Sequence, residues 1–143
     1  MVQVPRLPVA HCQAVVTADT GAQRSGVRRL TMECLFCRLR DQQAGQHVFE
    51  DDRCFVLKDL NPQAPTHLLV LPKQHLVGPN AVDDAAERDI GHLVHVAARL
   101  ARQLGIADSG YRLVVNCNGD AGQTVFHLHV HLLGGRQLQW PPG

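Results

Sequence analysis

The sequence contains no apolar run that approaches the roughly 18 residues of a membrane-spanning helix. It also carries no excess of charge: its formal net charge is +1, and a nearly neutral domain offers no extended basic surface to a long nucleic acid. No continuous apolar segment of the secretory type occurs near the N-terminus. We therefore expect a soluble globular protein that binds neither membranes nor nucleic acids.

The five cysteines form an odd count, which does not suit a framework of paired disulfides. Because a secretory signal is also missing, we expect a reducing compartment, the cytoplasm, in which the thiols are free or bound to a metal. The 143 residues suffice for one domain with a substantial core but not for two. The sequence therefore predicts a single cytoplasmic domain.

Residues 1–31 differ from the rest of the chain, because they show no sustained apolar period and contain four arginines against one acidic residue. Three explanations are open: a disordered extension, a start codon assigned upstream of Met32, or an organelle-targeting peptide. We expect a disordered or mis-assigned extension over 1–31 and the folded domain over 32–143.

Two periodicities organise the domain. Between residues 83 and 104, apolar side chains recur at the i, i+3, i+4, i+7 spacing of an amphipathic helix, and Gly105 is placed to end it. A shorter helix is predicted over 34–41. Strands are predicted over 46–50, 54–59, 66–71, 111–116 and 125–133. Strands in antiparallel succession around one main helix predict an α+β domain.

Near the C-terminal end, His127, His129 and His131 alternate with branched apolar residues. In a β-strand this period of two sends three imidazoles to one face and the apolar side chains to the other. Crowded imidazoles do not build a core, because they are polar and repel one another once protonated. The arrangement therefore predicts a site for a metal or for an anion.

These two alternatives differ in geometry. In line on a strand, the three imidazoles spread over about 13 Å and need a partner from elsewhere to converge on one ion. An anion suits the surroundings better, because the glycine-containing loop 118–124 leads into the strand and its backbone N–H groups can form a concave anion site. A neutral imidazole is also a competent nucleophile near neutral pH. We therefore favour attack on phosphorus by the middle histidine, His129.

Residues 127–133 resemble the His-φ-His-φ-His-φ-φ signature (φ apolar) of the histidine triad (HIT) superfamily. Five further segments are similar to its histidine triad nucleotide-binding branch, and the Trp-Pro-Pro-Gly end makes the likeness specific. They are residues 59–67, 71–75, 111–116, 122–127 and 134–143. The resemblance covers residues 34–143. It implies a HIT-like fold with an antiparallel sheet, one main helix and a short N-terminal helix, assembled as a homodimer.

The resemblance implies purine nucleoside phosphoramidase activity, which is hydrolysis of the P–N bond between AMP and an amine. His129 is then the nucleophile, and water hydrolyses the nucleotidyl-histidine intermediate. His131 holds phosphate oxygens, which stabilises the charge that develops on phosphorus. The backbone carbonyl of His127 orients the His129 ring, and the hydroxyl of Thr124 bonds a phosphate oxygen or the departing amine.

The same resemblance implies the nucleotide contacts. Asp59 accepts a hydrogen bond from a ribose hydroxyl, and Leu60 lies against the nucleoside. Trp140 approaches the active site of the partner subunit. Two positions depart from the family pattern, Lys58 and Cys117, and they leave the nucleobase and leaving-group preferences open. The residues implied at the phosphate site are Asn116, Gly122, Gln123, Thr124, His129 and His131.

Cys34 and Cys37 form a Cys-x-x-Cys pair at the start of the domain. Two thiolates at that spacing can hold zinc, but a tetrahedral structural site needs two more ligands. The resemblance, especially to microbial members, implies His67 and His127 as those ligands, with zinc as a structural cofactor that the chemistry does not require. Two reduced cysteines are the alternative, and a redox pair is less favoured without a thioredoxin-like context. The histidines interpreted as surface or packing residues are His75, His92 and His95.

Three functions are compared on this basis. The phosphoramidase is favoured, with a purine nucleotide linked to an amine as its substrate. A dinucleoside polyphosphate hydrolase of the fragile histidine triad type is the second, and the Trp-Pro-Pro-Gly terminus argues against it. A nucleotide-binding scaffold protein with little turnover is the third.

Overall fold

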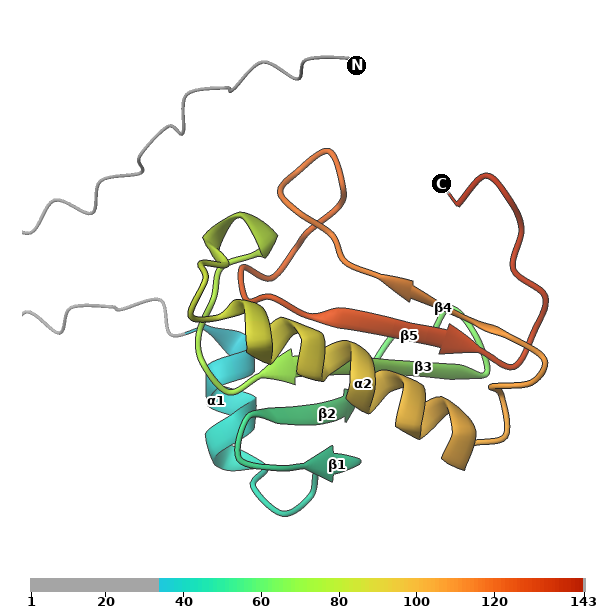
Figure 1. The fold of residues 1–143 in the computed structure, drawn as a ribbon, viewed down its shortest axis with the longest axis horizontal. Coiled ribbons are helices and arrows are strands. Elements are labelled where there is room, and N and C mark those ends of the chain that lie inside the picture. The colour runs from blue at the N-terminus through green and yellow to red at the C-terminus, as the bar shows by residue number, and fades with distance from the viewer. Residues whose placement is uncertain (1–33, 143) are drawn as a thin grey trace, which may run out of the picture. The chain divides into compact units, whose positions relative to one another are not determined.

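The computed structural model describes residues 34–142, so the predictions for residues 1–31 lie outside the described part of the chain. Five strands form one sheet in the order β1-β2-β3-β5-β4, and every neighbouring pair is antiparallel. This confirms the predicted α+β fold with one main helix and a short N-terminal helix (Figure 1). The elements in chain order are α1 (Leu35–Gln42), β1 (Phe49–Glu50), β2 (Cys54–Lys58), β3 (Thr66–Pro72), the 3₁₀ turn η1 (Pro79–Ala81), α2 (Glu87–Gln103), β4 (Tyr111–Val114) and β5 (Val130–Gly134).

Each face of the sheet carries its own apolar cluster, because side chains alternate along a strand. α2 lies across one face (Figure 1), and its buried residues pack on Val56, Val70 and Leu132. The opposite face carries Phe55 and Leu71, which pack with α1. Burial of each such side chain contributes on the order of 1.5–3 kcal/mol. The buried residues of α2 are Leu93, Val96, Ala97, Leu100 and Ala101.

α2 begins at Glu87 and not at residue 83 as predicted. Asp83 instead stabilises the turn before the helix, since its Oδ1 accepts a hydrogen bond from the Ala86 N–H at 2.9 Å. The end of the helix is as predicted. Gly105 has a φ of +70° and its N–H donates to the Arg102 carbonyl, while the Ile106 N–H donates to that of Ala101, which is the pattern of a Schellman motif. Among residues 34–142, no helix has the length and apolar character that crossing a membrane requires.

β5 begins at Val130, although a strand was predicted from residue 125. Its ladder with β3 begins at the pair Val70 and Val130. β3 ends at Pro72, which has no N–H to continue the ladder, and the Leu128 N–H donates to the Leu76 carbonyl at 2.6 Å instead. The strands predicted over 46–50 and 111–116 are likewise shorter, as β1 and β4.

Candidate active site and metal cluster

The three histidines lie on the sheet face that α1 covers. His127 and His129 precede β5, and His131 lies within it. His127 is fully buried, His129 is 7% exposed and His131 is half-buried. The predicted alternation is therefore present, although only its second half forms a strand. The apolar residues between them are buried in the cluster beneath α2: Leu128, Val130 and Leu132.

The ring of His129 is held in one orientation by the backbone of His127. Its Nδ1 lies 2.7 Å from the His127 carbonyl oxygen, which is the contact that the resemblance implied. Only an N–H can bond a carbonyl, so we assign the hydrogen to Nδ1 and the lone pair to Nε2. Phe36 of α1 packs edge-on against the ring, with centroids 5.3 Å apart. His129 thus presents an unprotonated nitrogen with nucleophilic character.

His131 has the opposite tautomer because of His67. The Gln63 N–H donates to His67 Nδ1 at 3.0 Å, which assigns the His67 hydrogen to Nε2. That nitrogen lies 2.8 Å from Nδ1 of His131, so His131 carries its hydrogen on Nε2. Within residues 34–142, this buried Nε2 has no hydrogen-bonding partner. An unpaired buried donor of this kind is suited to a bound oxygen atom.

Burial keeps the His131 ring neutral. Loss of solvent, together with the nearby rings of His129 and His67, lowers the pKa of His131 to about 4. At neutral pH the ring therefore acts as an N–H donor and not as a cation.

Asp59 follows β2 and lies beside His67. Its Oδ1 accepts a hydrogen bond from the Asn61 N–H at 2.8 Å, and its Oδ2 lies 3.3 Å from Nε2 of His67. A cavity of about 370 Å³ lies next to this turn, and Leu60, which is 98% exposed, is among its lining residues. The other lining residues are Leu39, Gln43, Gln46, Val48, Leu57 and Lys58.

The loop before the histidines is held by Gln123, whose side chain is buried. Its Oε1 accepts a hydrogen bond from the Asn118 N–H at 2.9 Å, and its Nε2 donates to the carbonyls of Val77 and Val125 at 2.7 and 3.2 Å. The resemblance implies that Gln123 lines the phosphate site, and in the structure its side chain has backbone partners that shape the loop. Gly122 provides the left-handed turn, with a φ of +75°.

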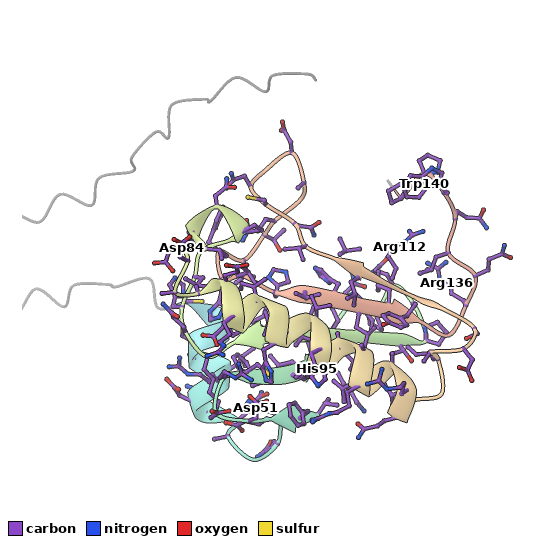
Figure 2. All side chains as sticks on the ribbon, viewed as in Figure 1. Asp51, Asp84, His95, Arg112, Arg136 and Trp140 are labelled. Carbon is purple, nitrogen blue, oxygen red and sulfur yellow. The ribbon has the colours of Figure 1, made fainter. Side chains whose placement is uncertain are left out.

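Two further predicted site residues lie at the ends of this loop: Asn116, which is half-buried, and Thr124, which is exposed. Trp140 is 82% exposed and lies at the end of the C-terminal segment (Figure 2). That segment is tied to the sheet because Arg112 donates to the Gln139 carbonyl at 2.6 Å, and Arg136 donates to the Gln63 carbonyl at 2.9 Å.

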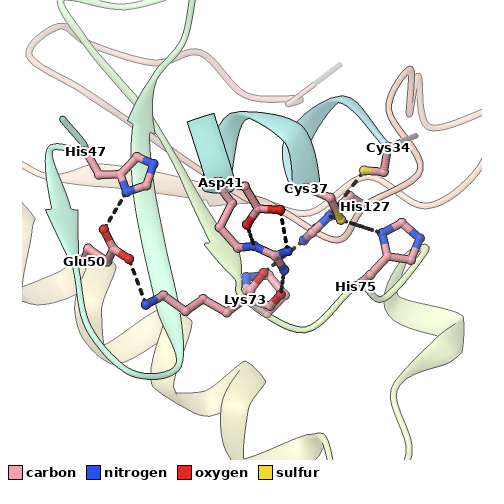
Figure 3. Close-up of polar contacts among 10 residues, drawn as sticks. Cys34, Cys37, Asp41, His47, Glu50, Lys73, His75 and His127 are labelled. Atoms are coloured by element: carbon pink, nitrogen blue, oxygen red, sulfur yellow. Dashed lines mark hydrogen bonds and ion pairs between the residues drawn. The ribbon is translucent and has the colours of Figure 1, made fainter. Parts of the chain in front are cut away.

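Four potential metal ligands converge beside the start of α1: Cys34, Cys37, His75 and His127 (Figure 3). Nδ1 of His127 lies 3.4 Å from Sγ of Cys34, 3.5 Å from Sγ of Cys37 and 3.3 Å from Nδ1 of His75. Sγ of Cys37 lies 3.4 Å from Nδ1 of His75. Zinc–ligand bond lengths place tetrahedral ligand atoms about 3.3 Å apart for two nitrogens and about 3.6 Å apart for nitrogen and sulfur. The four atoms therefore fit zinc.

The chemistry of the donors also fits. His127 Nε2 donates to the Pro72 carbonyl at 2.9 Å, which leaves the lone pair of Nδ1 directed at the cluster. Burial lowers the pKa of His127 to about 4, so the ring is in its neutral, metal-binding form. Burial and the adjacent Cys34 raise the pKa of the Cys37 thiol. A cation at this position would stabilise both thiolates.

The prediction that His67 completes this cluster is wrong. His75 is exposed, as its interpretation as a surface or packing residue implied, but it also lies within reach of the other three ligands. The antiparallel register pairs His67 with Leu133, so His67 lies near His131 and away from His127. Beyond the end of β3 at Pro72 this register is not kept, and the hydrogen bond from the Leu128 N–H to the Leu76 carbonyl brings His75 beside His127. No spacing in the sequence indicates this role of His75, because the contact joins residues that are 52 positions apart.

Comparisons with known proteins identify the family. Residues 40–138 match the family described as HIT domain. An uncharacterized HIT-like protein of Synechocystis sp. is 50% identical over 96 residues, which are 67% of this chain and 83% of the relative. A HIT family hydrolase from Legionella pneumophila Philadelphia 1 is 45% identical, with a TM-score of 0.72 over 77% of this chain and 99% of that one. A zinc-bound histidine triad family protein from Mycobacterium smegmatis is 30% identical, with a TM-score of 0.62 over 73% and 76% of the two chains.

Proposed function

The chain belongs to the HIT domain family, and from this premise we propose that it is a purine nucleoside phosphoramidase of the histidine triad nucleotide-binding branch. Its substrate in this proposal is AMP joined to an amine through a P–N bond. The coarser part of the proposal is supported by solved relatives described as HIT family hydrolases from Legionella pneumophila and Clostridium thermocellum.

The observation that carries the proposal is the pair of opposite tautomers at His129 and His131. Their rings lie on one sheet face with centroids 4.8 Å apart. One ring offers a lone pair on Nε2 and the other an N–H on Nε2, as their hydrogen bonds to His127 and His67 require. A nucleophile beside a fixed donor is the arrangement needed to attack phosphorus while an oxygen of the phosphate gains negative charge.

The reaction then has two steps. The lone pair of His129 Nε2 forms a bond to phosphorus, the P–N bond breaks, and the amine leaves with its electron pair and takes up a proton from solvent. The positive charge on the His129 ring is stabilised by the His127 carbonyl that faces its Nδ1–H. Water then attacks phosphorus and loses a proton to solvent, the bond to His129 breaks, and AMP and the neutral imidazole are released.

The nucleotide is proposed to extend from the histidines towards the cavity beside Asp59. Asp59 accepts from a ribose hydroxyl, and the apolar lining of the cavity, with Leu60 at its rim, suits a flat nucleobase. Lys58 lies in the same lining, where it can influence base preference. Asn116, Gly122 and Thr124 contribute to the phosphate site from the adjoining loop.

Zinc is proposed at Cys34, Cys37, His75 and His127, whose separations and donor types fit it. When bound, zinc supplies a structural cross-link between α1 and the start of the histidine segment. The zinc-bound relative from Mycobacterium smegmatis supports zinc as the metal. The reaction steps above use none of its chemistry.

A direct test is to incubate the protein with adenosine 5′-phosphoramidate and with an AMP–lysine conjugate and to measure AMP release by chromatography. We expect turnover by the wild type and a loss of roughly 10³-fold or more in His129→Ala. His95→Ala is the matched control, because that histidine is exposed on α2. Samples quenched with alkali, in which the P–N bond of a nucleotidyl-histidine is stable, should contain an adenylyl group on His129.

Two outcomes contradict the proposal. The first is no AMP release by the wild type, or equal release by His129→Ala. The second is comparable or faster turnover of a diadenosine polyphosphate, which favours the dinucleoside polyphosphate hydrolase. Nucleotide binding with negligible turnover of both substrates favours the scaffold function.

A further inference from the structure

His67 performs no step of the chemistry described above, yet it contacts residues assigned to both ends of the nucleotide. We propose that His67 is a positioning residue that couples the ribose-binding Asp59 to the phosphate-binding His131. The inference rests on the proposed function and deepens it, because it gives the ribose hydroxyls a part in turnover as well as in binding.

The position of His67 follows from the sheet. Leu69 of β3 pairs with His131 of β5, so His67, two residues earlier on the same face, is a diagonal neighbour of His131. His67 is only 7% exposed, and the Gln63 N–H fixes its Nδ1 as an acceptor. The ring therefore has one hydrogen to donate, on Nε2.

A metal shared by Asp59, His67 and His131 is the first alternative, since one donor atom of each lies within 4.8 Å of the others. The two nitrogens are 2.8 Å apart, however. That is a hydrogen-bond length, and it is clearly shorter than the separation of about 3.3 Å between two nitrogens on one zinc ion. A proton therefore lies between His67 and His131, in contrast to the cluster of cysteines and histidines.

The single hydrogen of His67 faces two acceptors. Nδ1 of His131 lies 2.8 Å away and Oδ2 of Asp59 lies 3.3 Å away. A ribose hydroxyl that donates to Asp59 satisfies the carboxylate and weakens its competition for this hydrogen. The hydrogen bond to His131 then holds the His131 Nε2–H towards the phosphate, where the alternative tautomer would present a repulsive lone pair.

The kinetic test compares adenosine 5′-phosphoramidate with its 2′,3′-dideoxy analogue. In the wild type we expect loss of the hydroxyls to lower kcat about 10-fold, in addition to raising KM. In His67→Leu we expect kcat for the ribose substrate to fall about 10- to 100-fold, with no further fall in kcat for the dideoxy substrate. His67→Gln retains an N–H near the position of Nε2 and should recover much of the lost kcat.

A spectroscopic test reads the tautomer without turnover. In ¹⁵N-histidine-labelled protein, long-range ¹H–¹⁵N spectra should place the His131 hydrogen on Nε2 in the wild type and in His67→Gln. In His67→Leu we expect a mixture of tautomers, and His95→Leu should leave the His131 signals unchanged. Thermal melting of each variant shows that it is folded.

The coupling is refuted if the dideoxy substrate loses the same factor in kcat in the wild type and in His67→Leu, or if the His131 tautomer is the same in both. A wild type that releases no AMP from either substrate refutes the proposed function instead. In that case the tautomer spectra alone decide whether His67 sets the hydrogen position on His131.

Discussion

The Nδ1 hydrogen of His129 is directed to the His127 carbonyl, whereas His127 directs its Nε2 hydrogen to Pro72 and His131 accepts one from His67. His129 is thereby left with a lone pair on Nε2, His127 with a lone pair on Nδ1, and His131 with an N–H on Nε2. One residue type can therefore supply the proposed nucleophile, metal ligand and phosphate donor, because the contact at one ring nitrogen sets the chemistry of the other.

The metal cluster yields a prediction at single residues. His75→Asn and Cys37→Ser should lose most of the bound zinc, because each removes one of four converging ligands. His67→Asn should retain it, since His67 bonds His131 instead. Metal content measured by mass spectrometry on protein purified without chelator shows whether His75 or His67 is the ligand. Zinc that is lost from His67→Asn but kept by His75→Asn would contradict the assignment.

The pKa of His131 yields a second prediction at the level of a single residue. Burial lowers it to about 4, against about 6.5 in the unfolded chain. Between these values the unfolded state binds more protons, so the free energy of unfolding rises with pH. The contribution of His131 is complete above about pH 6.5 and is lost as the pH falls towards 4, on the order of 1–2 kcal/mol for this half-buried ring.

Urea unfolding at about pH 7 and about pH 4.5 measures this effect. The stability of His131→Asn should fall less between the two values than that of the wild type, and His127, which both proteins contain, cancels in the comparison. Parallel losses in the two proteins would show that His131 does not titrate in this way.

At the scale of the elements, Gly91 within α2 and Gly105 at its end have equal space around them but different backbone conformations, so they test the effect of the backbone alone. Gly105 ends the helix with a φ of +70°, and a Cβ added there would meet no atom within 4 Å, so Gly105→Ala should destabilise the protein through the backbone alone, by about 1–2 kcal/mol. Gly91 lies within the helix with equal space around it. Gly91→Ala should stabilise by about 0.5–1 kcal/mol. Urea unfolding tests both, and shifts of the same sign would contradict the proposed cause.

For the whole molecule, the exposed indole of Trp140 concerns the proposed homodimer. It is the single tryptophan of the chain and is 82% exposed in one subunit, although two arginine contacts hold its segment in place. If a partner subunit covers the indole, its fluorescence should shift to the red on dilution. Light scattering should in parallel show a fall from twice 15.7 kDa to a single chain. A single-chain mass at all concentrations would refute the dimer.

Features that depend on local periodicity could be predicted from the sequence. The alternation of His127, His129 and His131 with apolar residues, the helix that ends at Gly105 and the antiparallel α+β class all follow from spacings of a few residues. Such spacings decide which side chains share a face, whatever the distant parts of the chain do. Even there the predicted elements began too early, because the starts of α2 and β5 depend on the hydrogen bond that Asp83 accepts from Ala86 and on the one that Leu128 donates to Leu76.

Which distant residues meet could be read only from the folded chain. The exchange of His67 for His75 in the metal cluster, the tautomer of His131 and the backbone partners of Gln123 all follow from contacts between segments far apart in the chain. The place of His67 beside His131, and with it the tautomer of His131, follows from the register of β3 against β5. A shift of one residue in that register would send every side chain to the opposite face. That register is set by the packing of two apolar clusters at once, and no local pattern in the chain encodes it.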